Sequence, residues 1–274
     1  MPGLQFIHAY AKVNLSLDVL GRRADGYHEL LGVMRRIDLN DEVYLEERNG
    51  VFVDCDVPLP PDNSAFRAAS AYARRAGVPG ASIRIKKGIP AEAGLGAASA
   101  DAAAVLTLMQ RLYGAMDEAA LFEIGCEIGA DVPFCLLGGT AFAEGIGEKL
   151  TPLPAPPMAF VVAKGERGIR TGELFSRLRL PALHPDHGAM KRALERGDLA
   201  AIGANMQNAL EPTAALSCPE IGEHKRRLLE EGALGACMTG SGSAVVGLFE
   251  TKEKAARAAN ALADIAFCRV CEGM

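Results

Sequence analysis

Residues 88–109 read Gly-Ile-Pro-Ala-Glu-Ala-Gly-Leu-Gly-Ala-Ala-Ser-Ala-Asp-Ala-Ala-Ala-Val-Leu-Thr-Leu-Met. Just before this stretch, residues 82–86 alternate polar and apolar side chains, which predicts a half-buried strand. At its end, apolar residues recur at helical spacing from Val105 to Leu112, and Gly114 supplies a stop signal. The stretch therefore predicts a strand, then a loop of very small residues, then a helix.

The loop in this stretch has the properties of a phosphate-binding loop. Its glycines, Gly94 and Gly96, let the backbone turn sharply and let a ligand approach it closely. The helix that follows presents unpaired N–H groups and the positive end of its dipole, which suit a phosphate. Small residues also serve tight packing of a helix on a sheet with no ligand at all. The motif favours phosphate binding and leaves the packing interpretation open.

Two common phosphate loops are excluded by the surrounding sequence. The Walker A pattern G-x-x-x-x-G-K-[ST] occurs nowhere in the chain. Residues 94–99 nearly match the dinucleotide pattern G-x-G-x-x-G/A, but the strand before them is amphipathic rather than buried. The acidic residue expected about 20 positions further on would be Asp117, which opens a predicted helix instead of ending a strand. A Rossmann fold is therefore not expected.

The composition is that of an ordinary globular protein. At 274 residues, with 49% hydrophobic and 23% charged residues, the chain is long enough for one large domain or two modest ones. A net charge of −5 argues against a nucleic-acid binder. The sequence has no apolar run of about 18 residues and no signal-peptide pattern, so we expect no membrane segment. Seven cysteines without matched pairs of C-x-x-C spacing predict reduced thiols and a cytoplasmic protein.

The first predicted strand carries a polar face. Polar and apolar residues alternate from Lys12 to Val19, which is the pattern of a strand. Lys12 and Asn14 share one face of it and could converge on one ligand. A solvent-facing side of an edge strand explains the same pattern, and this interpretation is favoured when the strand is considered alone.

A turn follows the first strand. Asp25-Gly26 is a hairpin signal, and Tyr27 and His28 come directly after it. An adjacent tyrosine and histidine at a loop exit could stack on a planar ligand and hydrogen-bond to it. A core tyrosine beside a surface histidine is an equally good interpretation of the pair.

Further short elements are predicted up to residue 147. A meander of strands near 33–37, 42–47 and 51–55 precedes a helix that Asp62 or Ser64 caps and Gly77 ends. Asp131 precedes Val132-Pro133, which on its own indicates the N-cap of a short helix. Residues 138–147 are punctuated by glycines and predict a hairpin.

Residues 151–157 contain four prolines, which predicts a boundary between domains at 1–152 and 153–274. After it we expect a strand at 158–163 and helices near 171–178, 186–196, 198–209 and 219–231. The chain then ends as strand 234–238, strand 245–249, helix 252–263 and strand 266–271. The small-residue loop Thr239–Ala244 between the first two of these strands could complete a phosphate site, although a plain hairpin turn explains it too.

Three separated motifs resemble the signature regions of the GHMP small-molecule kinases. They are Lys12 to Leu17, Pro90 to Ala103 and Thr239 to Ala244. Within that superfamily, other segments resemble the kinases that phosphorylate a cytidine diphosphate-linked methylerythritol in the non-mevalonate isoprenoid pathway. These segments are residues 11–15, Gly21-Arg-Arg-Ala-Asp-Gly-Tyr-His-Glu-Leu30, Gly129-Ala-Asp-Val-Pro-Phe134, Ala143-Glu-Gly-Ile-Gly-Glu148 and Asn208-Ala-Leu-Glu-Pro212.

The resemblance spans nearly the whole chain and implies a fold, cofactors and a site. The fold is a two-domain α+β GHMP kinase fold with the active site in the cleft between the domains. The cofactors are ATP and Mg²⁺, the acceptor is a small molecule, and the protein acts as a monomer or weak homodimer without nucleic acid or membrane. Lys12 and Asp131 are the implied catalytic residues, and Ser99 is the implied metal ligand. The implied acceptor-binding residues are Asn14, Tyr27, His28, Thr171 and Phe175, and the implied ATP-binding residues are Pro90, Glu92, Ala93, Gly94, Leu95, Gly96, Ala97, Ala98, Ser99, Ala100 and Asp101.

The resemblance also implies a mechanism. Asp131 accepts the proton of the acceptor hydroxyl, and Lys12 keeps Asp131 ionised while it stabilises charge on the transferred group. Two positions depart from the family pattern. Glu92 stands where a small residue is usual, and its charge is expected to weaken ATP binding; Ala100 replaces a second serine, so a hydroxyl contact is lost there.

Two other functions are carried as alternatives. Another GHMP kinase, acting on homoserine, mevalonate or a sugar, differs from this interpretation only at Tyr27 and His28. A non-catalytic nucleotide-binding module is supported by the departures at Glu92 and Ala100, whereas the presence of Lys12 and Asp131 argues against it.

Overall fold

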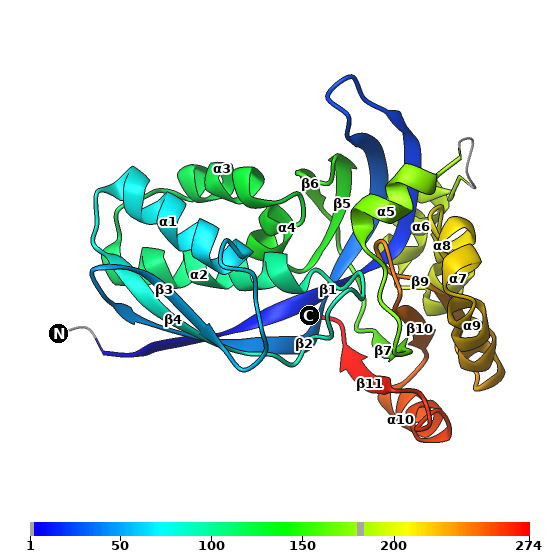
Figure 1. Ribbon diagram of the computed structural model, residues 1–274. Coiled ribbons are helices and arrows are strands. Elements are labelled where there is room, and N and C mark those ends of the chain that lie inside the picture. Colours follow the sequence, from blue (N-terminus) through cyan, green and yellow to red (C-terminus); the bar gives the residue numbers. More distant parts are fainter. Residues whose placement is uncertain (1–2, 180–183) are drawn as a thin grey trace. The chain divides into compact units, whose positions relative to one another are not determined.

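The structure is a computed structural model that describes residues 3–179 and 184–274. The chain forms helices and sheets in two compact units whose segments interleave along the sequence (Figure 1). The first unit consists of Met1–Ala11, Leu39–Ile89 and Gly96–Leu137. The second unit consists of Lys12–Asp38, Pro90–Leu95 and Gly138–Met274. The predicted division of the chain into domains at 1–152 and 153–274 stays a prediction.

The first unit is a sheet with helices packed on it. Strand β1 (Gln5–Arg22) belongs to this unit up to Ala11, and strand β2 (His28–Glu47) belongs to it from Leu39 onward. Strand β4 (Gly80–Lys86) pairs antiparallel with β2 and parallel with β3 (Gly50–Cys55). Its helices are α1 (Ser64–Ala76), α2 (Ala97–Tyr113), α3 (Glu118–Ile128) and α4 (Val132–Leu137).

The core of the first unit follows from the alternation of its strands and the small residues of its helices. Val43, Leu45, Ile83 and Ile85 are buried on the helix-covered face, where α1 and α2 contact the strands. Alanines line α2 from Ala100 to Ala104 and are buried, so the helix lies close to its neighbours. Gly114 ends α2 in the left-handed conformation with φ 61°, as the stop signal predicts.

The second unit contains two groups of strands. In one, β2 pairs antiparallel with β5 (Thr140–Gly145), β5 pairs with β6 (Lys149–Pro152), and β1 pairs parallel with β8 (Gln207–Asn208). The other is a four-stranded sheet in the order β11-β7-β10-β9. Its members are β7 (Ala159–Lys164), β9 (Gly235–Met238), β10 (Val245–Phe249) and β11 (Phe267–Glu272).

The described residues of the second unit, 12–38, 90–95, 138–179 and 184–274, form six helices. They are α5 (Thr171–Arg177), α6 (His187–Arg196), α7 (Leu199–Ala204), α8 (Glu211–Ser217), α9 (Glu220–Glu230) and α10 (Lys252–Ala261). All residues of β7 are buried, and helices α9 and α10 contact this strand. No helix in the described ranges is long and apolar enough to cross a membrane.

The predicted secondary structure is confirmed in most places and differs from the structure in four. The meander is wrong, because β2 runs unbroken from His28 to Glu47 and β3 pairs with β4 rather than with β2. The helix expected over 198–209 ends at Ala204, and the short strand β8 follows it. Helix α8 was not expected. The cap of α1 is Asn63, whose side chain accepts from the N–H of Phe66, and not Asp62 or Ser64.

Two loops of the second unit are packed closely on each other. Gly94 has φ 72°, and a Cβ built on it would lie 2.0 Å from the carbonyl oxygen of Thr239. A Cβ on Gly240 would lie 2.6 Å from the carbonyl oxygen of Gly94. The N–H groups of Ser243 and Ala244 donate to the carbonyls of Glu92 and Ala93 at 3.1 and 3.2 Å. Gly94 therefore has to be glycine because a second loop lies against its backbone. The sequence had suggested two other reasons, close approach of a ligand and tight packing of a helix on a sheet.

Gly94→Ala tests this packing, with Gly26→Ala as the matched control. Both glycines have positive φ, which costs an alanine about 1–2 kcal/mol. Gly26 has no neighbouring atom within 4 Å, whereas Gly94 meets the backbone of Thr239. We expect Gly94→Ala to lower the free energy of unfolding by a further ~1–3 kcal/mol, measured by urea denaturation. Equal losses in the two variants would contradict the packing.

Candidate active site

The polar face of β1 is buried in the second unit. Lys12 is 4% exposed and Asn14 is 3% exposed, and the Lys12 ammonium donates to Asn14 Oδ1 at 2.8 Å. The strand lies between β2 and β8. The interpretation of this face as the solvent side of an edge strand is therefore wrong, because both faces of β1 are covered. A buried lysine and asparagine in contact are typical of a site that recognises a polar ligand.

Asn14 connects β1 to the loop after β9. Its backbone N–H donates to Thr239 Oγ1 at 3.0 Å, and its side-chain oxygen accepts from the N–H of Gly240 at 3.0 Å. The N–H of Lys12 donates to the carbonyl of Leu95 at 3.0 Å. The second unit therefore brings together the first motif, the Pro90–Leu95 part of the second motif, and the third motif.

Asn208 supports the same loop, and sequence reasoning gave it no role. Its amide donates to the carbonyls of Met238 and Gly240 at 2.7 and 2.8 Å, and its oxygen accepts from Leu210 N–H at 2.9 Å. Glu211 accepts from the N–H of Met238 at 2.8 Å. The matched segment Asn208 to Pro212 was the available signal, because it places an asparagine and a glutamate three residues apart.

The start of α2 lies in the first unit and is open to an anion. Gly96 stands at the N-cap with φ 74°, and no side chain in the described part of the chain caps the helix there. The N–H of Ala100 bonds to the carbonyl of Gly96 at 2.8 Å. The N–H groups of residues 97–99 stand at the positive end of the dipole of a helix that runs from Ala97 to Tyr113.

The segment that carries Asp131 lies beside this helix start. A Cβ on Gly129 would lie 3.8 Å from Ser99 Oγ. The N–H of Val132 donates to the carbonyl of Gly129 at 3.1 Å, and the N–H of Cys135 to the carbonyl of Asp131 at 3.0 Å, so a tight turn leads into α4. Asp131 and Ser99 thus belong to the first unit, whereas Lys12 and Asn14 belong to the second.

The predicted ATP-binding residues differ in what they offer a ligand. Glu92 and Ala98 are exposed, and Pro90, Gly94, Gly96, Ala97 and Ser99 are partly exposed. Ala93, Leu95, Ala100 and Asp101 are buried. The side chain of Ala100 packs in the core of the unit, so a serine at this position would have to place its hydroxyl among apolar atoms.

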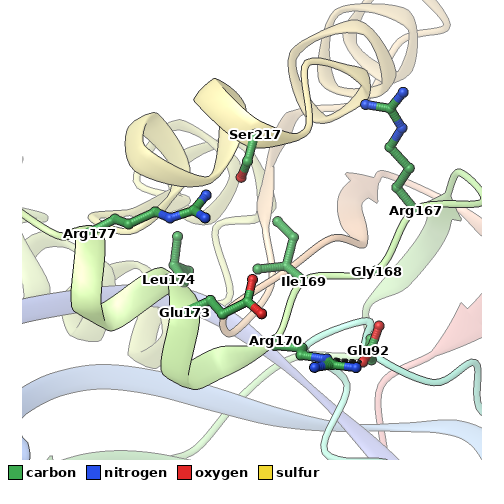
Figure 2. A pocket seen from close by; sticks show the side chains of 9 residues that line it. All are labelled: Glu92, Arg167, Gly168, Ile169, Arg170, Glu173, Leu174, Arg177 and Ser217. Atoms are coloured by element: carbon green, nitrogen blue, oxygen red, sulfur yellow. Dashed lines mark ion pairs between the residues drawn. The ribbon is translucent and has the colours of Figure 1, made fainter.

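Glu92 turns toward the segment before α5 (Figure 2). It has φ 49°, its carboxylate lies 3.6 Å from Arg170 Nε, and a Cβ on Gly168 would meet its Oε2 at 2.3 Å. Both side chains of this ion pair are more than half exposed, so the pair contributes little to stability. A cavity of about 310 Å³ opens beside it, lined by Glu92, Arg167, Gly168, Ile169, Arg170, Glu173, Leu174, Arg177 and Ser217.

Three of the predicted acceptor-binding residues are connected through α5. The ring of His28 stacks on the ring of Phe175, with centroids 4.7 Å apart and planes inclined by 29°. Thr171, one turn before Phe175, shares a hydrogen bond of 2.8 Å with Ser241. Helix α5 therefore contacts both the third motif and the strand that follows the first turn. Tyr27 is 60% exposed and presents an open ring.

The turn that carries Tyr27 and His28 is held by Arg23. Its guanidinium pairs with Asp25 and Glu29, each at 3.0 Å, and the Asp25 carboxylate accepts from the N–H of Tyr27 at 3.1 Å. Burial, with a contribution from Arg22, lowers the pKa of His28 below its ordinary value. His28 is therefore neutral at pH 7 and offers one donor and one acceptor.

The sequence matches two family models and many curated relatives. The GHMP kinases N terminal domain model matches residues 63–139, and the GHMP kinases C terminal model matches residues 190–266. A curated relative from Acetivibrio thermocellus is 43% identical over 258 residues and covers 91% of both chains. Another, from Carboxydothermus hydrogenoformans, is 45% identical and covers 91% of this chain and 90% of its own. Both bear the name 4-diphosphocytidyl-2-C-methyl-D-erythritol kinase.

Solved structures agree with these relatives. A crystal structure of 4-(cytidine 5'-diphospho)-2C-methyl-D-erythritol kinase matches with a TM-score of 0.86 and 39% identity over 98% of this chain and 99% of its own. A homoserine kinase from Cytophaga hutchinsonii matches with a TM-score of 0.80 over 100% of this chain and 95% of its own, and at 22% identity it shares the fold alone. This chain therefore belongs to the GHMP kinase family, among the 4-diphosphocytidyl-2-C-methyl-D-erythritol kinases.

Proposed function

We propose that this chain transfers a phosphoryl group from ATP to a hydroxyl of 4-diphosphocytidyl-2-C-methyl-D-erythritol, in the non-mevalonate isoprenoid pathway. The observation that carries the proposal is an identity of 43–45% with kinases of that name over nine tenths of the chain. The buried Lys12 and Asn14 beside two glycine-containing loops support a phosphoryl transfer site.

The ATP phosphates bind over Gly94 to Ser99 in this proposal. The uncapped start of α2 supplies N–H donors, and the left-handed Gly96 turns the backbone so that these donors are free to face an anion. The buried residues of the loop, Ala93, Leu95 and Ala100, contribute through their backbone and through packing. The carboxylate of Glu92 faces Arg170, so part of its charge is balanced within the protein.

Mg²⁺ is the proposed metal, and the residues present fit it. Mg²⁺ commonly keeps several waters and binds through one or two protein oxygens together with substrate phosphates. In the described residues no group of three or more His, Cys, Asp or Glu is placed to hold a metal, and such a cage is not what a nucleotide-bound Mg²⁺ requires. The partly exposed hydroxyl of Ser99, at the start of α2, would hold the ion, which neutralises phosphate charge when bound.

The chemical step uses Asp131 and Lys12 in this proposal. The acceptor oxygen attacks the γ-phosphorus, its proton passes to the Asp131 carboxylate, and the bond to the ADP oxygen breaks. Lys12 balances charge on the transferred group. Asn14 orients Lys12, with which it already shares a hydrogen bond of 2.8 Å.

The cytidine of the acceptor binds near the His28 and Phe175 rings in this proposal. A planar base can stack on aromatic rings, and the neutral His28 offers both a donor and an acceptor to its edge. Tyr27 adds an open aromatic face, and Thr171 adds a hydroxyl held by Ser241. These groups distinguish a cytidine-linked acceptor from the acceptors of other GHMP kinases.

The setting of the enzyme is also proposed. We expect a cytoplasmic monomer or weak homodimer that acts on small molecules without nucleic acid. The seven cysteines support a reducing compartment, because no disulfide joins them in the described structure, which includes all seven.

An acceptor panel tests the proposed reaction. With ATP as donor, we expect phosphorylation of 4-diphosphocytidyl-2-C-methyl-D-erythritol and little transfer to free methylerythritol, its uridine analogue, homoserine or mevalonate. A site that hydrogen-bonds a substrate group rejects analogues that leave it unpaired. Initial rates with labelled ATP measure this. Faster transfer to homoserine or mevalonate would contradict the acceptor, and ATP binding without any transfer would favour the non-catalytic module.

Tyr27→Ala tests the place of the base. Stacking on an aromatic ring is worth about 1–3 kcal/mol per base, and about 1.4 kcal/mol is a factor of ten. We therefore expect the KM for the acceptor to rise about tenfold or more at a nearly unchanged KM for ATP. Tyr27→Phe, which keeps the ring, is the control and should stay close to wild type. A rise in the KM for ATP alone would place the base elsewhere.

A further inference from the structure

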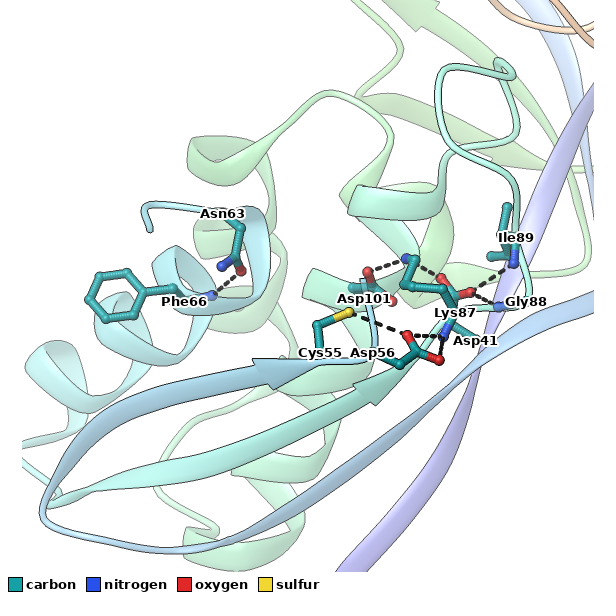
Figure 3. Close-up of polar contacts among 9 residues, drawn as sticks. All are labelled: Asp41, Cys55, Asp56, Asn63, Phe66, Lys87, Gly88, Ile89 and Asp101. Atoms are coloured by element: carbon teal, nitrogen blue, oxygen red, sulfur yellow. Dashed lines mark hydrogen bonds and ion pairs between the residues drawn. The ribbon is translucent and has the colours of Figure 1, made fainter. Parts of the chain in front are cut away.

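Three charged side chains form a buried cluster in the first unit (Figure 3). Lys87, which follows β4, donates from its ammonium to Asp41 of β2 and, at 2.7 Å, to Asp101 of α2. The side chains of Lys87, Asp41 and Asp101 are 14%, 0% and 6% exposed. The cluster therefore joins a strand, the end of a second strand and a helix through one ammonium group.

Asp41 holds the chain just before the phosphate loop. Its Oδ1 accepts from the N–H groups of Gly88 and Ile89 at 2.6 and 2.8 Å. Gly88 passes so close to β2 that a Cβ on it would lie 2.3 Å from the carbonyl oxygen of Asn40. The backbone is thus fixed at the point where the chain leaves the first unit for Pro90–Leu95.

Asp101 holds the chain just after the loop. It lies in the second turn of α2, which begins at Ala97, where the chain has returned to the first unit. Its bond to Lys87 ties this end of the loop to the same ammonium that Asp41 holds. Both ends of the loop are therefore tied to one point.

We propose that Asp41, Lys87 and Asp101 are positioning residues that hold the two ends of the phosphate loop at a fixed separation and so preform it for ATP. This inference rests on the proposed ATP site. Stability alone does not call for such a cluster, because apolar residues that replace a buried ion-pair network are often as stable or more so. The cluster instead fixes geometry. It holds the N–H donors of residues 97–99 at a fixed distance from Ile89 before ATP binds.

The charge of the cluster depends on pH. Burial raises the pKa of Asp101 to about 7, and Asp41 adds to this while Lys87 opposes it. Burial alone lowers the pKa of Lys87, but the two carboxylates outweigh it, so its pKa lies above the ordinary value. From the β3 side, Cys55 lies against Asp56, and the carboxylate of Asp56 accepts from the N–H of Lys87 at 3.0 Å.

The raised pKa of Asp101 means that the folded state becomes less stable as the pH rises. The folded chain keeps a proton on Asp101 that the unfolded chain releases near pH 3.8, so the stability that this proton provides is lost as the pH rises to about 7. Asp101→Asn cannot ionise and keeps an oxygen for Lys87. The melting temperature of this variant minus that of wild type should therefore increase as the pH is raised from 4 to 8. A difference that stays constant over this range would contradict a buried ionisable Asp101.

The kinetic test compares Asp101→Ala with Asp101→Asn. Because a loop displaced by a fraction of an ångström loses much of its binding geometry, we expect Asp101→Ala to raise the KM for ATP by about tenfold or more. The KM for the acceptor and kcat at saturating ATP should change far less. Asp101→Asn should restore most of the ATP affinity, which a titration of the protein with an ATP analogue measures without turnover.

Gln110→Leu is the matched control on the same helix. Gln110 bonds to the hydroxyl of Tyr72 at 2.7 Å and to the carbonyl of Met116 at 2.6 Å, so its loss destabilises α2 away from the loop. It should lower the melting temperature and leave the KM for ATP unchanged. If Asp101→Ala behaves like Gln110→Leu, the cluster is only structural and the proposal is wrong. If the wild-type chain neither binds nor uses ATP, the proposed function itself fails.

Discussion

The close contact between Gly94 and the loop after β9 is the constraint on which the site depends. A Cβ at Gly94 would lie 2.0 Å from the carbonyl oxygen of Thr239, so the two backbones can meet only if this residue is glycine. Asn14 bonds to Thr239 and Gly240 of the same loop, and Lys12 bonds to Leu95 beside Gly94. The position of the buried lysine is thus coupled to a backbone contact that no side chain could replace.

The phosphate loop is held in two ways along its length. Its middle, Pro90–Leu95, packs on the loop after β9 in the second unit. Its two flanks belong to the first unit, where Asp41, Lys87 and Asp101 tie them together. A loop with almost no side chains has little means of fixing its own shape, so both supports come from other segments. Rigid support from outside fits a loop whose N–H groups have to be in place before the anion arrives.

Sequence patterns predicted most of this fold because local signals and tertiary packing agree there. The strand before the loop, the helix ended by Gly114, and the strand-strand-helix-strand ending are confirmed. For β1 considered alone, the alternation favoured a solvent-facing polar side, because alternation does not show whether a second layer covers it; only the family resemblance gave Lys12 and Asn14 a role. The clusters around Asn208 and Asp101 were missed as supports, since their partners lie far away in the sequence and only the fold brings them together.

The central proposal is that Lys12 and Asp131 act as one group on the acceptor hydroxyl. The most direct measurement is a kinetic double-mutant cycle of Lys12→Met and Asp131→Asn. Each single change should lower kcat by roughly 10²–10⁴, and the double variant should be scarcely slower than the slower single one, because neither residue works without the other. ATP affinity should change little in Asp131→Asn. Losses that add in the double variant, or a kcat within about threefold of wild type for either single change, would contradict the account.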